Sequence, residues 1–144
     1  MTGFQAHILL LYGKFILLYI PVVLMALILA INEEKDSLVL AERILAGEGH
    51  RVTPFGRVRE AVEWLREHSP DLVLASGGRH GEKAKETVNL LKSAGIPGSK
   101  ILLLTSPVSL PSVRKALQEE VRAVMQETVD YEDLLRLVKA AVDH

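Results

Sequence analysis

One short loop brings together residue types that could bind an anion. Residues Ser76 to Gly81 read S-G-G-R-H-G. Glycine amides beside an arginine at the start of a helix suit a phosphate group, so Gly77, Gly78 and Arg79 form a candidate anion loop. The loop lacks the spacing and the terminal Lys-Ser/Thr of a P-loop, and it lacks the dinucleotide-binding fingerprint. We therefore expect mainly a flexible connection between a strand and a helix.

The same loop contains a hydroxyl and an imidazole, which is the chemistry of a nucleophile and its base. Ser76 and His80 are four residues apart on a glycine-rich segment, and that spacing fixes no geometry between them. A surface histidine is the expected role for His80. The sequence therefore predicts a protein that is not an enzyme.

Length and composition narrow the possible classes. A chain of 144 residues can bury one core of ordinary size. Seventeen Lys plus Arg against eighteen Asp plus Glu leave a net charge of -1, which gives no electrostatic case for nucleic acid as a partner. The chain has no cysteine, so disulfides, thiolate metal sites and cysteine nucleophiles are excluded, and a cytoplasmic location is expected.

From Met25 onward the sequence alternates strand and helix signals five times. The expected strands cover 25–31, 50–54, 71–75, 100–105 and 121–125, and the expected helices cover 34–46, 58–67, 82–94, 110–119 and 131–142. This alternation predicts a parallel sheet covered by helices on both faces. Functional residues are then expected at the carboxyl ends of the strands.

The N-terminal segment has a different character. Between residues 8 and 31 the one charged side chain is Lys14. The charge-free run 15–31 has 17 residues, and as a helix it would reach only ~26 Å at ~1.5 Å per residue, short of a ~30 Å hydrocarbon core. Because 25–31 is also needed as the first strand, we expect residues 1–24 to form a separate apolar helix.

Three roles remain open for that helix. It would be a membrane anchor, a packing or dimerising helix, or an upstream extension if the natural start is Met25. A signal peptide fits less well, since Lys14 lies inside the apolar segment and no A-x-A-like site follows. The expected organisation is therefore an N-terminal segment over 1–24 and a domain over 25–144.

Four motifs in the domain resemble the receiver domain of response regulators, over about 120 residues. G-E-G-H resembles the turn into the second strand, and S-P-D-L-V-L the approach to the phosphorylation site. I-L-L-L-T-S is similar to the fourth strand, and D-Y-E-D-L-L to the opening of the last helix. The motifs begin at Gly47, Ser69, Ile101 and Asp130. The resemblance implies a flavodoxin-like (βα)5 three-layer fold with a central five-stranded parallel sheet.

The resemblance also identifies a pocket. In receivers two acidic residues after the first strand hold Mg²⁺, and an aspartate after the third strand accepts the phosphoryl group. A Ser or Thr after the fourth strand and a lysine after the fifth contact that group. The matching positions here are Asn32, Glu33, Ser76, Thr105 and Glu127. Since only Glu33 and Thr105 have the expected chemistry, the resemblance implies a degenerate phosphorylation pocket.

Two of these departures bear on function. A serine at position 76 needs a base to become a nucleophile, and its phosphoester would lack the lability of an acyl phosphate. Glu127 places a carboxylate where the family has a cation, so an incoming phosphoryl group would be repelled. We hypothesise that Glu127 hydrogen-bonds Ser76 or Thr105 directly and locks the pocket.

Carboxylates near the first strand raise the question of a metal. Glu33 and Glu34, with Asn32 and Glu127, offer the hard oxygen ligands that Mg²⁺ prefers. Acidic residues are favoured at the starts of helices for electrostatic reasons, even where no metal binds. The main expectation is therefore that these carboxylates are solvated loop residues. We therefore predict no cofactor, with Mg²⁺ as the alternative.

The resemblance and its departures together predict a phosphorylation-independent, receiver-like regulatory domain that acts by protein–protein interaction in signal transduction. Its expected contact surface, for another protein or for itself, is the face formed by the fourth helix, fifth strand and fifth helix of the receiver unit. One alternative is a divergent receiver that still works in a two-component phosphorelay. Another is a small-ligand or nucleotide sensor that uses the loop 76–81. Fold resemblance alone does not decide among them.

Overall fold

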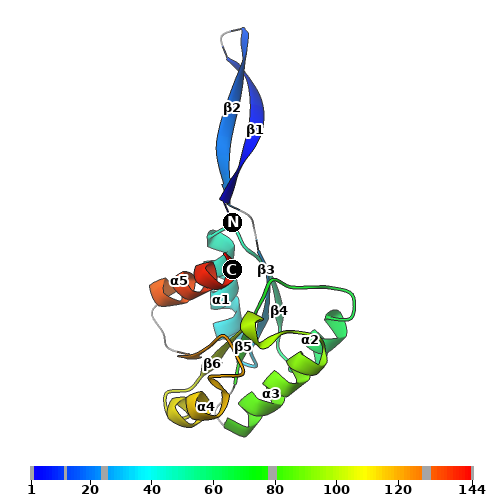
Figure 1. The fold of residues 1–144 in the computed structure, drawn as a ribbon, viewed down its shortest axis with the longest axis vertical. Helices are drawn as coiled ribbons and strands as arrows, with labels where there is room; N and C mark the ends of the chain where they lie inside the picture. The colour runs from blue at the N-terminus through cyan, green and yellow to red at the C-terminus, as the bar shows by residue number, and fades with distance from the viewer. Residues whose placement is uncertain (1, 12, 24–25, 78–80, 128–130, 144) are drawn as a thin grey trace.

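A five-stranded parallel sheet forms the centre of the fold (Figure 1). The structure is a computed structural model that describes residues 2–11, 13–23, 26–77, 81–127 and 131–143. The sheet order is β4-β3-β5-β6-β7, and every neighbouring pair is parallel. This is the predicted flavodoxin-like (βα)5 fold of a receiver domain.

The strands of the sheet are β3 (Leu27–Ile31), β4 (Arg51–Phe55), β5 (Leu72–Ser76), β6 (Ile101–Thr105) and β7 (Ala123–Gln126). The helices are α1 (Lys35–Gly47), α2 (Val58–Trp64), α3 (Gly81–Ser93), α4 (Leu110–Leu117) and α5 (Tyr131–Val142), with a short 3-10 turn η1 (Gly98–Lys100) before β6. An N-terminal pair, β1 (Thr2–Leu11) and β2 (Lys14–Val23), forms a separate antiparallel sheet.

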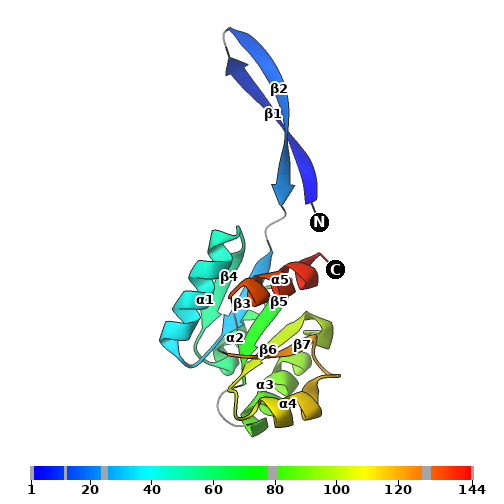
Figure 2. The same cartoon turned by 90° about the vertical axis from the view of Figure 1, so that its left-hand side faces the viewer.

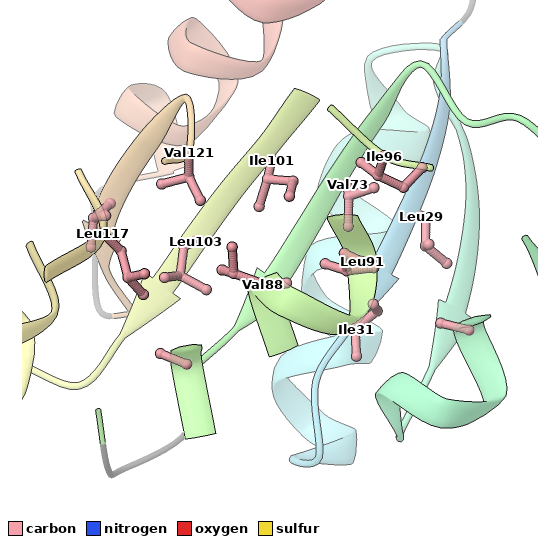
Figure 3. Close-up of a cluster of buried hydrophobic side chains, with 14 of the residues drawn as sticks. Leu29, Ile31, Val73, Val88, Leu91, Ile96, Ile101, Leu103, Leu117 and Val121 are labelled. Carbon is pink, nitrogen blue, oxygen red and sulfur yellow. The ribbon is translucent and has the colours of Figure 1, made fainter. Parts of the chain in front are cut away.

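The two faces of the sheet bury alternate residues of the central strands. In β6, Ile101 and Leu103 lie in one core cluster with α2, α3 and α4, as Figure 3 shows, whereas Leu102 lies in a second cluster with α1 and α5. All three side chains are fully buried. A strand buried on both faces must be apolar throughout, which explains the continuous apolar runs in β3, β5 and β6.

Most element boundaries lie within one or two residues of the expected ones, and the end of α2 differs by three. Helix α2 ends at Trp64 and not at residue 67, where turns follow. Strand β7 begins at Ala123, because Val121 closes the turn that follows α4 through a hydrogen bond from its amide to the Leu117 carbonyl oxygen (3.2 Å). The Val121 side chain is buried in the core. This apolar residue, which was expected to begin the strand, therefore anchors a turn.

The predicted apolar helix over residues 1–24 was wrong. Strands β1 and β2 pair in register from Thr2 opposite Val23 to Leu11 opposite Lys14, and Figures 1 and 2 show the hairpin projecting away from the domain. A helix would carry Gly13 and Pro21 in its interior, and both residue types are unfavourable there. In the hairpin Gly13 takes the positive φ of 74° that the turn requires.

The apolar run 15–31, considered above as a membrane-spanning helix, is divided between β2 and β3. Among the helices formed by the described residues, none has the combination of length and apolar character needed to cross a bilayer.

Candidate functional site

The carboxyl edge of the sheet gathers the residues that the sequence singled out. Asn32 and Glu33 follow β3, Ser76 ends β5, Thr105 ends β6, and Glu127 follows β7. Because the five strands are parallel, these ends lie at the same edge, where parallel α/β sheets generally bind their ligands.

A direct hydrogen bond crosses this edge. The Ser76 hydroxyl donates to the Glu127 carboxylate, with an Oγ to Oε1 distance of 2.6 Å. Ser76 is half-buried and Glu127 is exposed. A hydroxyl that donates to a charged carboxylate forms a short, charge-assisted bond, which is stronger than one between neutral groups. The hypothesised contact between Glu127 and Ser76 is therefore present in the structure.

Backbone hydrogen bonds set the position of both partners. The Glu127 amide donates to the Thr105 carbonyl oxygen at 2.8 Å, and the Gly77 amide donates to the Leu104 carbonyl oxygen at 2.6 Å. These bonds extend the sheet by one residue beyond β7 and β5. The side-chain bond between Ser76 and Glu127 therefore spans β6, which lies between these two strands.

Thr105 does not make the alternative contact with Glu127. Its side chain is fully buried, and its Oγ1 atom has no hydrogen-bond partner among the described residues. A buried hydroxyl without a partner is unfavourable by about 1–3 kcal/mol. A bound group that forms a hydrogen bond with the Thr105 hydroxyl would remove this cost.

A lysine that the sequence analysis did not single out reaches the same edge. The Lys83 ammonium, from the first turn of α3, forms an ion pair and hydrogen bond with the Glu33 carboxylate. About half of each side chain is exposed to solvent, so the pair is at the surface. Helix α3 is the element that follows β5, so its first turn lies near the carboxyl edge of the sheet. A cationic residue at the start of this helix was therefore the signal in the sequence that could have identified Lys83.

Asn32 and Glu34 are used in the connection to α1. The Asn32 side-chain oxygen accepts a hydrogen bond from the Glu34 amide at 2.9 Å, and the Ser37 hydroxyl donates to the Glu34 carboxylate at 3.4 Å. In the ranges that the structure describes, no group of three or more His, Cys, Asp or Glu side chains is placed to hold a metal ion. The Mg²⁺ alternative stays a prediction.

The candidate anion loop is described only at its first glycine. The Gly77 amide already donates to Leu104, and a Cβ atom built on Gly77 would lie 2.8 Å from the Cβ of Ala84. The glycine is therefore needed for the close approach of β5 and α3. Gly78 and Arg79, the other two members of the loop, lie outside the described residues, as does His80.

A small pocket of about 90 Å³ lies beside the edge, between α1 and α5. Its floor is apolar, with Leu74 and Leu104 from the sheet, and Asn32 and Glu127 stand at its polar end. Tyr131, which also lines it, is 47% exposed. Sequence patterns did not indicate this pocket, since its lining residues come from elements that are far apart in the sequence.

A second surface is formed by α4, β7 and α5, the three elements expected to carry partner contacts. Arg114 on α4 donates to the Val124 carbonyl oxygen at 3.2 Å, and Arg136 on α5 forms an ion pair with Asp133 at 3.1 Å. Both arginines line a shallow groove together with Val124 and Leu137. The surface therefore combines cationic side chains with apolar ones.

Several solved structures with the same fold are response regulators or receiver domains. A response regulator from Thermotoga maritima is 17% identical, with a TM-score of 0.68 over 84% of this chain and 100% of that one. The receiver domain of a sensor histidine kinase from Pseudomonas aeruginosa, which holds a magnesium ion in its active-site cleft, is 19% identical, with a TM-score of 0.66 over 84% and 100%. A receiver domain from Clostridium thermocellum is also 19% identical, with a TM-score of 0.65 over 83% and 95%.

No protein-family model and no curated protein matches the sequence. At these identities the structural similarity establishes a receiver-like fold and leaves the chemistry to be argued from the residues.

Proposed function

We propose that this protein is a phosphorylation-independent, receiver-like regulatory domain that acts in signal transduction by binding another protein or itself. The observation that carries the proposal is the 2.6 Å hydrogen bond between Ser76 and Glu127. It occupies the two positions where a receiver has its phospho-acceptor and its lysine, so neither position offers an aspartate nucleophile or a cation to a phosphoryl group.

The ion pair of Lys83 with Glu33 supports the same proposal. Glu33 is the one acidic residue that matches a magnesium ligand of the family, and here its charge is neutralised by an ammonium group. A divalent cation at Glu33 would compete with Lys83 for this carboxylate. The P. aeruginosa receiver domain, in contrast, holds magnesium in its cleft.

The proposed contact surface is the one formed by α4, β7 and α5. Its groove brings the cationic side chains of Arg114 and Arg136 beside apolar Val124 and Leu137. A surface with arginine anchors around an apolar centre suits a protein partner. The cytoplasm is the proposed location.

The proposal is tested by phosphorylation with a small-molecule donor. The full chain is incubated with acetyl phosphate and Mg²⁺, and its intact mass is measured. We expect no phosphoryl adduct. The Ser76→Asp/Glu127→Lys double variant, which restores the family pattern at both positions, is the matched positive control. A stoichiometric adduct on the unaltered chain would overturn the proposal.

One observation favours a second function, a divergent receiver that is still phosphorylated. The Thr105 hydroxyl is buried and unpartnered within the described part of the chain, at the position where the family contacts the phosphoryl group. Under this alternative, Thr105→Val would abolish an adduct that the unaltered chain forms with acetyl phosphate. If the unaltered chain forms none, this second function is rejected.

A further inference from the structure

The pocket between α1 and α5 is large enough for a small organic molecule. Both helices pack on the same face of the sheet, where they share one core cluster (Figure 2). The pocket has a volume of about 90 Å³. A single water molecule needs roughly 10–15 Å³ of such space, so the pocket has room for about six groups of that size.

Two alanines leave this space open at the inner end of the pocket. Ala30 lies on β3 opposite Leu74 of β5, and Ala41 lines the pocket from α1. Leu134 of α5 also lines it, and Ala30, Leu74 and Leu134 are all buried. A larger side chain at either alanine would take up part of the pocket. Its inner end is therefore an apolar, water-poor surface.

The outer end of the pocket carries a single charge. Glu127 is the only charged residue among the described residues that line the pocket. Its side chain is exposed, so the carboxylate lies on the solvent side, whereas the leucine floor is deeper. Small-molecule sites generally have this character, with mainly apolar walls and a few polar groups that orient the ligand.

The Glu127 carboxylate is held in position from two sides. Its backbone amide donates to the Thr105 carbonyl oxygen at 2.8 Å, and its Oε1 atom accepts the Ser76 hydroxyl at 2.6 Å. Within the ranges that the structure describes, Glu127 forms no ion pair. The pocket therefore presents an oriented carboxylate whose charge is not balanced by a cationic side chain in those ranges.

We propose that this pocket binds a small aliphatic monoamine. An apolar body of about four to six carbons fills the inner end, and the ammonium group donates to Glu127 at the outer end. A ligand with a carboxylate at that end would be repelled by Glu127. A divalent cation needs about six oxygen ligands, and the described residues place no group of three acidic or metal-binding side chains together.

The lysine side chain of a partner protein is a poorer occupant. It would enter with its ammonium group first and place a charge against the buried floor at Leu74 and Leu134, where water is excluded. A free amine enters with its apolar end first. Its ammonium group then stays at the exposed end, beside Glu127 and in contact with water.

The first experiment titrates the full chain with three ligands that share one carbon skeleton and differ in the polar group. These are 3-methylbutylamine, 3-methylbutanol and 3-methylbutanoate, followed at pH 7 by the chemical shifts of the backbone amides. We expect saturable shifts around the pocket with the amine, with a dissociation constant in the millimolar range. The alcohol should bind roughly fivefold more weakly, since the ion pair is exposed, and the carboxylate more weakly still.

The second experiment repeats the titrations with matched pairs of variants. In Glu127→Gln the preference for the amine over the alcohol should fall to about twofold or less, whereas Glu48→Gln, an exposed carboxylate outside the pocket, should preserve it. Ala41→Leu should weaken the binding of both ligands about tenfold, because its side chain takes up the space of about two CH₂ groups. Ala46→Leu, on the exposed part of α1, should leave both affinities within about twofold. The dispersion of the amide spectrum verifies that each variant is folded.

Three results would overturn the proposal. One is the absence of saturable shifts around the pocket in the unaltered chain, which needs no variant to fold. Another is equal affinity for the amine and the carboxylate. The third is tighter binding of N-acetyl-lysine methylamide than of 3-methylbutylamine, which would assign the pocket to the side chain of a partner. None of these titrations contains a phosphoryl donor, so they do not depend on the outcome of the phosphorylation test.

Discussion

The hairpin and the parallel sheet are built from similar apolar strands, and yet their surroundings differ. In the sheet, β6 buries Ile101, Leu102 and Leu103 completely. In the hairpin, β1 and β2 are also mainly apolar, and they pair only with each other within the described part of the chain. The sheet strands are separated in sequence by amphipathic helices that fold back as covers, whereas two residues join β1 to β2. An apolar strand therefore becomes part of a core only when other elements of the chain pack against its faces.

The largest expected effect is on the core. Leu103→Ala removes a fully buried side chain from β6 and should lower the free energy of unfolding by about 2–5 kcal/mol. Leu9→Ala in β1 is the matched change outside the domain and should leave the unfolding of the domain unaltered. Urea denaturation followed by the fluorescence of Trp64 measures both. Similar destabilisation by the two variants would mean that the hairpin is part of the cooperative core.

The next effect concerns the contact between β5 and α3. In Gly77→Ala the added methyl group would lie 2.8 Å from the Cβ of Ala84, which is itself fully buried. Something must move, and such overpacking typically costs about 1–3 kcal/mol. Gly47→Ala, where an added Cβ meets nothing within 4 Å, is the control. Thermal unfolding by circular dichroism compares them, and equal midpoints would exclude a close approach at Gly77.

A smaller effect is expected at the carboxyl edge of the sheet. Ser76→Ala, Glu127→Ala and the double variant form a thermodynamic cycle for the hydrogen bond across β6. Because Glu127 is exposed, we expect a coupling of only about 1 kcal/mol. Urea denaturation supplies the four free energies. Strict additivity would mean that the bond contributes nothing to stability in solution.

The smallest effect is expected for the ion pair at the same edge. Lys83→Met removes the partner of Glu33 and should change stability by about 0.5 kcal/mol or less, since both side chains are substantially exposed. The more informative readout is Mg²⁺ affinity by isothermal titration calorimetry, which we expect to increase when the ammonium is removed. Lys85→Met, an exposed lysine two residues along α3, should leave Mg²⁺ affinity unchanged.

Sequence patterns predicted the domain well because its periodicities are strong. Continuous apolar runs identified β3, β5 and β6, and the motifs at their ends located Ser76 and Glu127 at one edge. The hydrogen bond between those two residues followed from their chemistry once both were placed at the ends of the strands on either side of β6.

The hairpin and Lys83 were missed for physical reasons. Residues 8–24 are apolar at nearly every position, so neither the helical nor the strand period stands out there, and the turn at Gly13 was the main local signal. Lys83 lies on an otherwise ordinary exposed helical turn, and only the three-dimensional placement of α3 over β3 brings it to Glu33.

The connectivity of the strands also has a consequence for the order of folding. Contacts between β1 and β2 join residues close in sequence, and hairpins of this kind close in about 1–10 μs. Each parallel pair in the sheet needs a crossover to close first, which is intrinsically slower. During synthesis the residues of β1 and β2 are also made first, so the contacts of the hairpin can begin to form while β6 and β7 are still being made.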